Sequence, residues 1–342
     1  MAESDIRLAT LQNVMQSQPS IESTGRIGDR SLWRYTYATM SAMRALLISA
    51  LLCAIAMTAA AKVTVPFDFS KTEVAVDASI RGRAVFVLID TGVDPSLIDL
   101  HLAETLGFKI DRAEAGEASG FGDGKGAAIY AVTIDGIQIG AHNFGSFAAL
   151  ASDLNALSSR FGRSLDAIIG YSFLSDKIVM FDYPQKLFAI LDRSSDVKRI
   201  AAQCRKHWST KLDTVESYPV IPKFRFGNTV GPITIDTGAN SGIGLYQSAL
   251  DDASIRSALI EQGAETHTGA RGDATTASYK FDAPVGFGPF ELPAGQIVST
   301  HKESGSRTTR VANVGNALFA VMNLRMILDY RSRQMTFLGD CR

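Results

Sequence analysis

Two carboxylates in matching surroundings are the residues of this chain that could do chemistry. Asp90 lies in VFVLIDTGVDPSLI (residues 85–98) and Asp236 lies in PITIDTGANSGIGL (residues 232–245), each at the end of a β-branched apolar run. A lone carboxylate beside a buried strand is costly to desolvate, but two that face each other can share one proton. The ionised partner could then deprotonate a water while the protonated partner polarises a carbonyl. That chemistry is amide hydrolysis without a metal or a covalent intermediate.

The residues beside each Asp suit two turns that face each other. Gly92 and Gly238 allow a sharp turn and the close approach of another chain segment. Thr91 and Thr237 supply hydroxyls that can bond the opposing turn. We therefore predict that these four residues support the Asp pair from below.

An internal repeat extends well beyond the two Asp-Thr-Gly motifs. Gly170 and Gly315 follow the first and second Asp by 80 and 79 residues, and Asp182 and Asp329 follow them by 92 and 93. Between these landmarks lie GFGDGKGAAIY and GARGDATTASY, both rich in glycine or small residues and both ending in Tyr. Such spacing argues against two unrelated surface turns, such as cation-binding loops. The chain reads as two copies of a unit of roughly 130 residues.

The elements expected in each copy are mostly strands. Runs such as KVTVPFDF and RAVFVLID lie between Gly, Asp and Pro, and SLIDLHLAETLGF and ALDDASIRSALIEQG have helical spacing. KIVMFDYPQKLFAIL predicts a hairpin that turns at Pro184, and MILDYRSRQMTFL repeats it without the proline. We predict a mainly β protein with a first lobe over residues 62–195, a linker over 196–214 and a second lobe over 215–342.

Composition excludes some classes of function. The 342 residues are 46% hydrophobic and 20% charged with a formal net charge of −1, which gives no electrostatic case for nucleic acid. The length is enough for two domains. The histidines have no ligand spacing, and GFGDGKG does not match a dinucleotide-binding fingerprint. We therefore expect neither a metal nor a cofactor.

Residues 1–61 read as an N-terminal extension followed by a signal peptide or anchor. Residues 45–61, ALLISALLCAIAMTAAA, are apolar, follow Arg44 and end in small residues, which is typical of a secretory signal. A helix of that length would span only about 26 Å of a bilayer core of roughly 30 Å. We expect cleavage after Ala61, with membrane anchoring through this segment as the alternative. Both place the rest of the chain in the periplasm or outside the cell.

Cysteine usage agrees with export. Cys204 and Cys341 are the cysteines that follow the signal segment. Two cysteines in an oxidising compartment are natural partners, so we predict a disulfide between them. Two unrelated free thiols are the alternative.

Three motifs carry a resemblance to a known family: Asp90-Thr91-Gly92, Asp236-Thr237-Gly238 and Ile168-Ile169-Gly170. Over residues 63–340 the chain resembles two-lobed aspartic proteases of the pepsin and retroviral protease clan. DTGVD is closer to the retroviral enzymes, and IIGYSFLSDKIVMFDYPQKLFAIL is similar to the tail of bacterial retropepsin-like proteins. The resemblance implies a bilobal pepsin-like acid protease fold, with two homologous β-barrel-like lobes and a cleft between them.

The resemblance also implies roles for residues. Asp90 and Asp236 would be the catalytic dyad, with Thr91 and Thr237 gripping each other across the lobes. Ile168-Ile169-Gly170 would pack behind the first Asp turn, with Val314-Gly315 as its counterpart, although Asn313 replaces the first apolar residue there.

Two hairpins, residues 118–130 and 267–279, would be flaps over the cleft. The candidate substrate-binding residues in them are Gly120, Phe121, Gly122, Tyr130 and Tyr279.

We therefore expect an exported aspartic endopeptidase that acts on peptides or proteins, and a monomer because both lobes lie in one chain. The alternative is an inactive peptide-binding protein on the same fold. Degenerate lobes usually lose an Asp or the Gly beside it, and both are intact here. Val93 and Ala239, the third residues after each Asp, carry no hydroxyl that could stabilise a carboxylate. The pair should therefore hold its proton to higher pH than a pepsin dyad does.

Overall fold

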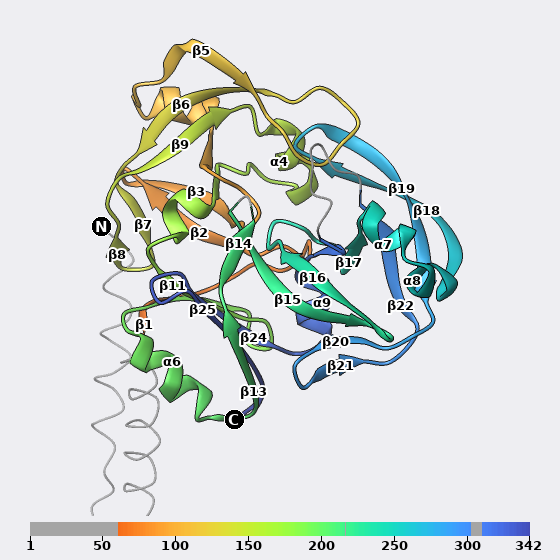
Figure 1. Ribbon diagram of the computed structural model, residues 1–342. Helices are drawn as coiled ribbons and strands as arrows, with labels where there is room; N and C mark the ends of the chain where they lie inside the picture. The colour runs from red at the N-terminus through yellow and green to blue at the C-terminus, as the bar shows by residue number, and fades with distance from the viewer. Residues whose placement is uncertain (1–60, 216, 302–309) are drawn as a thin grey trace, which may run out of the picture. The chain divides into compact units, whose positions relative to one another are not determined.

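The structure is a computed structural model that describes residues 61–215, 217–301 and 310–342 (Figure 1). The predicted signal segment lies outside the described residues up to residue 60, and the first strand begins at Ala61. Among the described residues, no helix has the length and apolar character needed to cross a membrane. Most of this part of the chain forms strands in three sheets, so the predicted mainly β fold is confirmed.

The first repeat forms a nine-stranded sheet around two parallel strands. Strand β3, RAVFVLI, is buried over its last five residues, as expected for β-branched and aromatic side chains covered on both faces. It pairs in parallel with β10, whose three residues are all buried. The strand order is β5 (Asp111–Glu117), β6 (Ala128–Ile134), β9 (Phe147–Ser152), β4 (Ser96–Asp99), β10 (Ala167–Ile169), β3 (Arg83–Ile89), β2 (Ala75–Ile80), β7 (Ile137–Ile139) and β8 (His142–Asn143).

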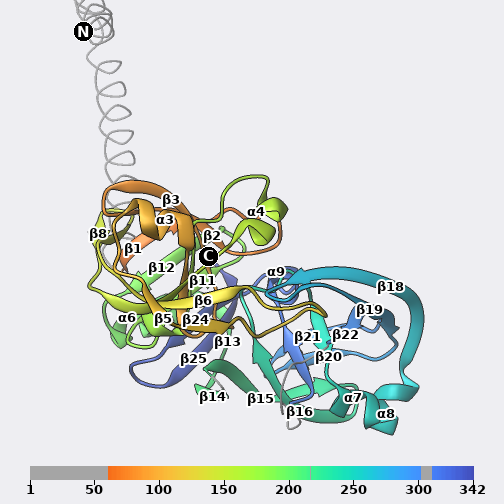
Figure 2. The ribbon, with the colours of Figure 1, turned by 90° about the horizontal axis from the view of Figure 1, so that it is seen from above.

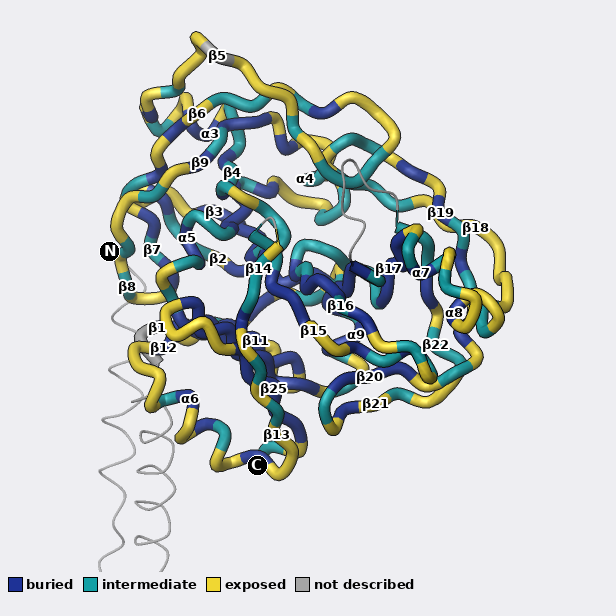
Figure 3. The backbone as a smooth tube through the Cα atoms, in the orientation of Figure 1, coloured by how far each residue is buried: buried dark blue, intermediate teal, exposed yellow. Residues whose placement is uncertain are grey.

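The second repeat forms a sheet with the corresponding order. Strand β16 pairs in parallel with β23, as β3 does with β10. The last three residues of β16 are buried, whereas the edge strand β18 is largely exposed (Figure 3). The order is β18 (Leu259–Gly269), β19 (Gly272–Phe281), β22 (Gln296–Thr300), β17 (Ile243–Leu245), β23 (Ala312–Val314), β16 (Thr229–Ile235), β15 (Tyr218–Phe226), β20 (Val285–Phe287) and β21 (Phe290–Leu292), with β14 (Asp213–Val215) on β15.

A third sheet joins the repeats. Its centre is the antiparallel pair of β11 and β24, and each of these strands also forms one of the two predicted hairpins. The buried pair is crossed by an ion pair in which Arg325 Nη2 lies 2.6 Å from Asp182 Oδ2. The strand order is β1 (Ala61–Pro66), β12 (Leu187–Leu191), β11 (Ile178–Asp182), β24 (Arg325–Asp329), β25 (Gln334–Cys341) and β13 (Cys204–Lys211).

The segment 196–214, predicted as a linker, has regular structure. Helix α6 (Ser194–Ala201) leads into β13, which pairs with β25 at the end of the chain. Cys204 lies opposite Cys341 in that pair, and the predicted disulfide joins them with Cα atoms 3.9 Å apart. Strand β13 of this segment is therefore one edge of the third sheet.

The other helices of the described residues are short, and most of them follow strands. The stretch SLIDLHLAETLGF begins as β4 and becomes helical after Asp99, whose carboxylate accepts from the Leu102 N–H. ALDDASIRSALIEQG is divided at Asp252, which caps the second of two helices before β18 begins at Leu259. The helical spacing was thus right in part, and local capping set the bounds. These helices are α3 (Leu100–Thr105), α4 (Asn155–Phe161), α5 (Tyr171–Leu174), α7 (Gln247–Asp251), α8 (Ala253–Ser257) and α9 (Asn316–Val321).

Candidate active site

Each Asp-Thr-Gly turn begins where a central strand ends. The Asp90 N–H donates to the Ile169 carbonyl at 2.9 Å, and the Asp236 N–H donates to the Val314 carbonyl at the same distance. Behind the turns, a methyl group on Gly170 would overlap the Val93 carbonyl. Gly315 meets the second turn in the same way. The apolar-apolar-Gly segment and its counterpart therefore lie behind the two turns.

The two threonines lock the turns together. The Thr91 N–H donates to Thr237 Oγ1 at 3.0 Å, and the Thr237 N–H donates to Thr91 Oγ1 at 3.1 Å. The Thr91 hydroxyl donates to the Ile235 carbonyl at 3.0 Å, and the Thr237 hydroxyl donates to the Ile89 carbonyl at 2.8 Å. Both side chains are buried. The network fixes one turn against the other.

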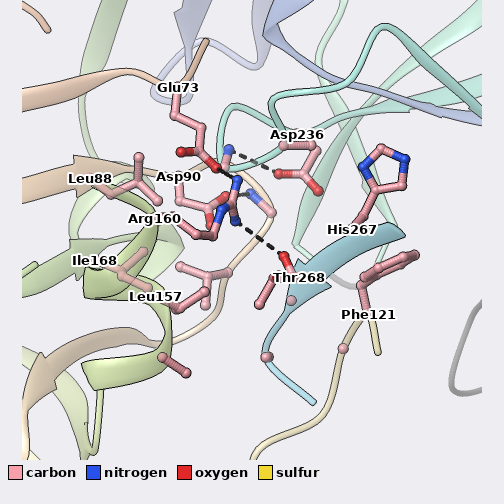
Figure 4. Close-up of a pocket in the computed structure, with 18 of the residues that line it drawn as sticks. Glu73, Leu88, Asp90, Phe121, Leu157, Arg160, Ile168, Asp236, His267 and Thr268 are labelled. Atoms are coloured by element: carbon pink, nitrogen blue, oxygen red, sulfur yellow. Dashed lines mark hydrogen bonds and ion pairs between the residues drawn. The ribbon is translucent and has the colours of Figure 1, made fainter. Parts of the chain in front are cut away.

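The glycines of the motif let the two carboxyl groups approach. Each accepts from the Gly of its own turn, Asp90 Oδ1 at 2.7 Å from the Gly92 nitrogen and Asp236 Oδ1 at 3.0 Å from the Gly238 nitrogen. A methyl group on Gly92 would lie 2.6 Å from Asp236 Oδ1, and one on Gly238 would overlap Asp90. Each carboxyl group thus lies against the other turn's glycine, and both line one cavity (Figure 4).

Burial raises the pKa of Asp90 well above its usual range, and the negative charge of Asp236 raises it further. The hydrogen bond from the Gly92 N–H opposes this shift. The net effect favours the neutral, protonated form of the Asp90 carboxyl group.

The surroundings of the two Asp differ. Asn313 Nδ2 donates to Asp236 Oδ2 at 3.0 Å, and the Thr234 hydroxyl donates to Asn313 Oδ1 at 2.7 Å. The residue in the place of Asn313 beside Asp90 is Ile168, which cannot donate. The only sequence signal of this contact was the polar residue in an otherwise apolar motif.

A buried ion pair beside the Asp pair was missed from the sequence. Arg160 Nη2 lies 2.6 Å from Glu73 Oε1, and Arg160 Nη1 donates to the Thr268 carbonyl at 3.1 Å (Figure 4). Glu73 Oε2 is buried and accepts no hydrogen bond from any described residue. Burial raises the pKa of Glu73 to about 7 despite the arginine, because one oxygen stays unsolvated and Asp236 adds negative charge. No local motif predicts either residue, since only tertiary packing brings α4 to the segment before β2.

The cavity around these groups has a volume of about 470 Å³ and two unlike walls. Side chains of the second repeat give it a polar wall that includes Asn240, Thr300 and His301. The first repeat contributes an apolar wall made by Leu88, Leu97, Leu154, Leu157, Phe161 and Ile168.

Two hairpin tips meet over the cavity. The loop between β5 and β6 reaches the turn between β18 and β19 (Figure 2). The Gly124 N–H donates to the Arg271 carbonyl at 2.8 Å, and the Arg271 N–H donates to the Phe121 carbonyl at 3.0 Å. A third bond runs from the Asp123 N–H to the Asp273 carbonyl at 3.2 Å. The two predicted flaps are therefore bonded tip to tip.

The predicted flap residues fall into two groups. Gly120 and Phe121 line the cavity, and Gly122 beside them packs against the Arg271 backbone. Tyr130 lies in β6 and Tyr279 in β19, within the strands of the hairpins and not in the cavity lining. The structure therefore brings the glycine-rich tip, and neither tyrosine, to the cavity.

A family model described as aspartyl protease matches residues 76–173. The match covers the first Asp-Thr-Gly and Ile168-Ile169-Gly170, and it supports assignment of the chain to the aspartic proteases, which are hydrolases. The second Asp-Thr-Gly lies outside the matched residues. No curated protein matches the chain.

Proposed function

We propose that this protein is an aspartic endopeptidase in which Asp90 and Asp236 form the catalytic dyad. The observation that carries the proposal is the pair of interlocked turns, with each carboxyl group against the other turn's glycine. We also propose the bilobal pepsin-like arrangement, one lobe for each repeat. The matching strand orders and the shared third sheet support it.

The mechanism follows from one shared proton. The ionised carboxylate takes a proton from a water held between the two groups, and the water oxygen attacks the peptide carbonyl carbon. The protonated carboxyl gives its proton to the carbonyl oxygen, forming a tetrahedral diol. The carboxyl group that took the water proton then gives it to the amide nitrogen, while the other carboxylate takes a proton from one diol hydroxyl. The C–N bond breaks, an acid and an amine leave, and the pair again holds one proton. Thr91 and Thr237 hold the two carboxyl groups in register throughout.

The substrate would be an extended peptide under the two hairpin tips. The apolar wall fits an apolar side chain next to the scissile bond. Three backbone hydrogen bonds join the tips, so they must part to admit a segment from within a longer chain. We propose that Gly120 and Phe121 contact the bound peptide, because both line the cavity.

We also propose that the protein is exported and acts as a monomer. The apolar segment 45–61 supports export, and so does the Cys204–Cys341 disulfide, since such bonds persist in oxidising compartments. Both Asp-Thr-Gly motifs lie in one chain, so the dyad needs no second copy.

The test is cleavage of a denatured protein by the purified enzyme, with and without a pepstatin-type inhibitor. Asp90→Asn and Asp236→Asn should each lower kcat by more than about a thousandfold while the melting temperature holds, since general acid–base groups supply up to about 10⁴-fold. Asp77→Asn is the matched control, because its side chain is 81% exposed on β2. An Asn variant that keeps more than about a thousandth of the activity would contradict the shared dyad.

A further inference from the structure

Equivalent positions beside the two Asp carry opposite chemistry. In the first repeat, Ile168 of β10 lies opposite Leu88 of β3. In the second, Asn313 of β23 lies opposite Thr234 of β16. All four side chains are buried. One carboxyl group has apolar neighbours and the other has a polar network.

A polar network holds the Asn313 amide against Asp236. The Thr234 hydroxyl, itself 3.2 Å from the Tyr246 hydroxyl, donates to Asn313 Oδ1. The amide nitrogen donates to Asp236 Oδ2 at 3.0 Å. With the Gly238 N–H on Oδ1, both oxygens of Asp236 accept from groups that can only donate.

The carboxyl group of Asp90 has different surroundings. Its Oδ1 accepts from the Gly92 N–H, and its neighbours Leu88 and Ile168 offer no donor. Hydrogen bonds from N–H groups favour the charged form of a carboxyl group, whereas apolar surroundings favour the neutral form. The two environments therefore push the proton in the same direction, away from Asp236 and onto Asp90.

We propose that Asn313 is a positioning residue that assigns the two roles, making Asp236 the base that activates water and Asp90 the acid that protonates the carbonyl. This rests on the proposed function of the pair. The raised pKa of Asp90 agrees with the assignment. A catalytic pair with unlike neighbours starts every cycle with its proton on the same side, so the water and the carbonyl have fixed places.

Other titratable groups face the pair. Glu73 carries a charge that acts on both Asp, with Arg160 as its partner. Tyr218 lies beside Gly92, and Tyr330 is buried within reach of the Asp90 charge. His267 and His301 line the same cavity farther toward the hairpin tips.

The test follows the carboxyl groups directly. NMR of protein with ¹³C-labelled aspartate carboxyl groups, from about pH 2 to about pH 8, reports each protonation state without any need for turnover. Asp90→Asn and Asp236→Asn assign the signals. In the wild type, Asp236 should be ionised while Asp90 still holds its proton. The reverse order overturns the proposal.

Two variants give each Asp the kind of neighbour that the other Asp has. Asn313→Leu should move the first proton release, and the acidic limb of kcat/KM, by about one pH unit toward neutrality, with KM changed by less than about twofold. Ile168→Asn gives Asp90 a donor and should move the alkaline limb down by about one pH unit. A fall in melting temperature without either shift would mean a merely structural role and overturns the proposal.

Two further outcomes are separable. If Asn313→Leu fails to fold, Thr234→Val keeps the shape, removes the hydroxyl that orients the amide, and should shift the acidic limb in the same direction. An unshifted limb in Thr234→Val then overturns the proposal. If the wild type cleaves nothing, the proposed function fails, while the carboxyl titration still decides what Asn313 does.

Discussion

Around Asp90 the first repeat places Leu88 and Ile168, whereas around Asp236 the second repeat places Thr234 and Asn313. The backbones at these positions pair in the same way, so the difference is confined to side chains. Glu73 has a counterpart too: Glu73 lies two residues before Ala75, which pairs with Leu88, and Tyr218 lies two residues before Val220, which pairs with Thr234. Repetition of the backbone brings two carboxyl groups together, and divergence of side chains beside them decides how they share a proton.

The largest effect on the free energy of unfolding is expected from the disulfide, which has no equivalent at the opposite edge of the third sheet. Strands β13 and β1 are equivalent edges of the third sheet, but only β13 is tied, through Cys204. The bond closes a separation of 137 residues, so Cys204→Ser with Cys341→Ser should lower the free energy of unfolding by about 4–5 kcal/mol in the chain-entropy model. Urea unfolding measures it. A change below about 1 kcal/mol would show that β13 pairing alone holds this edge.

A smaller effect on the free energy of unfolding is expected from Glu73, and none of this kind from its counterpart Tyr218. Burial raises the pKa of Glu73 to about 7, so between its unfolded pKa and that value the folded state binds the proton more tightly than the unfolded state does. The contribution of Glu73 to stability is therefore full at acid pH and falls as pH rises toward 7, by about 3 kcal/mol. Glu73→Gln should remove that fall, as measured by urea unfolding across this window.

Tyr218→Phe is the matched control for that measurement. It changes the counterpart position and leaves the Glu73 carboxyl group in place, so it should keep the wild-type slope of stability against pH. Equal slopes in Glu73→Gln and the wild type would contradict the raised pKa.

The smallest effect on stability is expected at the glycine of the Asp-Thr-Gly turn, a feature that the two repeats share. Gly92→Ala would place a methyl group 2.6 Å from Asp236 Oδ1, so overpacking should lower stability by about 1–3 kcal/mol and push the two carboxyl groups apart. Gly145→Ala is the control, since a methyl group there meets nothing within 4 Å. Thermal unfolding and kcat measure both variants. A Gly92→Ala protein with wild-type stability and kcat would mean that the turns lie farther apart than described.

Features that depend on local sequence were predictable. The Asp-Thr-Gly turns, the hairpin at Pro184 and the repeat itself follow from motifs and spacing, and the structure has the corresponding strand orders. The pairing of β13, within segment 196–214, could not be predicted because its partner lies at the far end of the chain. Glu73 and Arg160 were missed for the same reason, since no short-range pattern predicts a contact between β2 and α4. Asn313 was visible as a departure, but its effect required the register that places it opposite Thr234.

The pairing of β11 with β24 has a consequence for how the chain is made. All five residues of each strand are buried, and the partner of β11 comes from the other repeat. During synthesis the first repeat therefore emerges with an open, largely apolar strand edge, before β24 exists. Such an edge pairs readily with another chain. Crowded nascent chains should thus be prone to exchange strands with one another, and rapid completion of the second repeat is what closes that route.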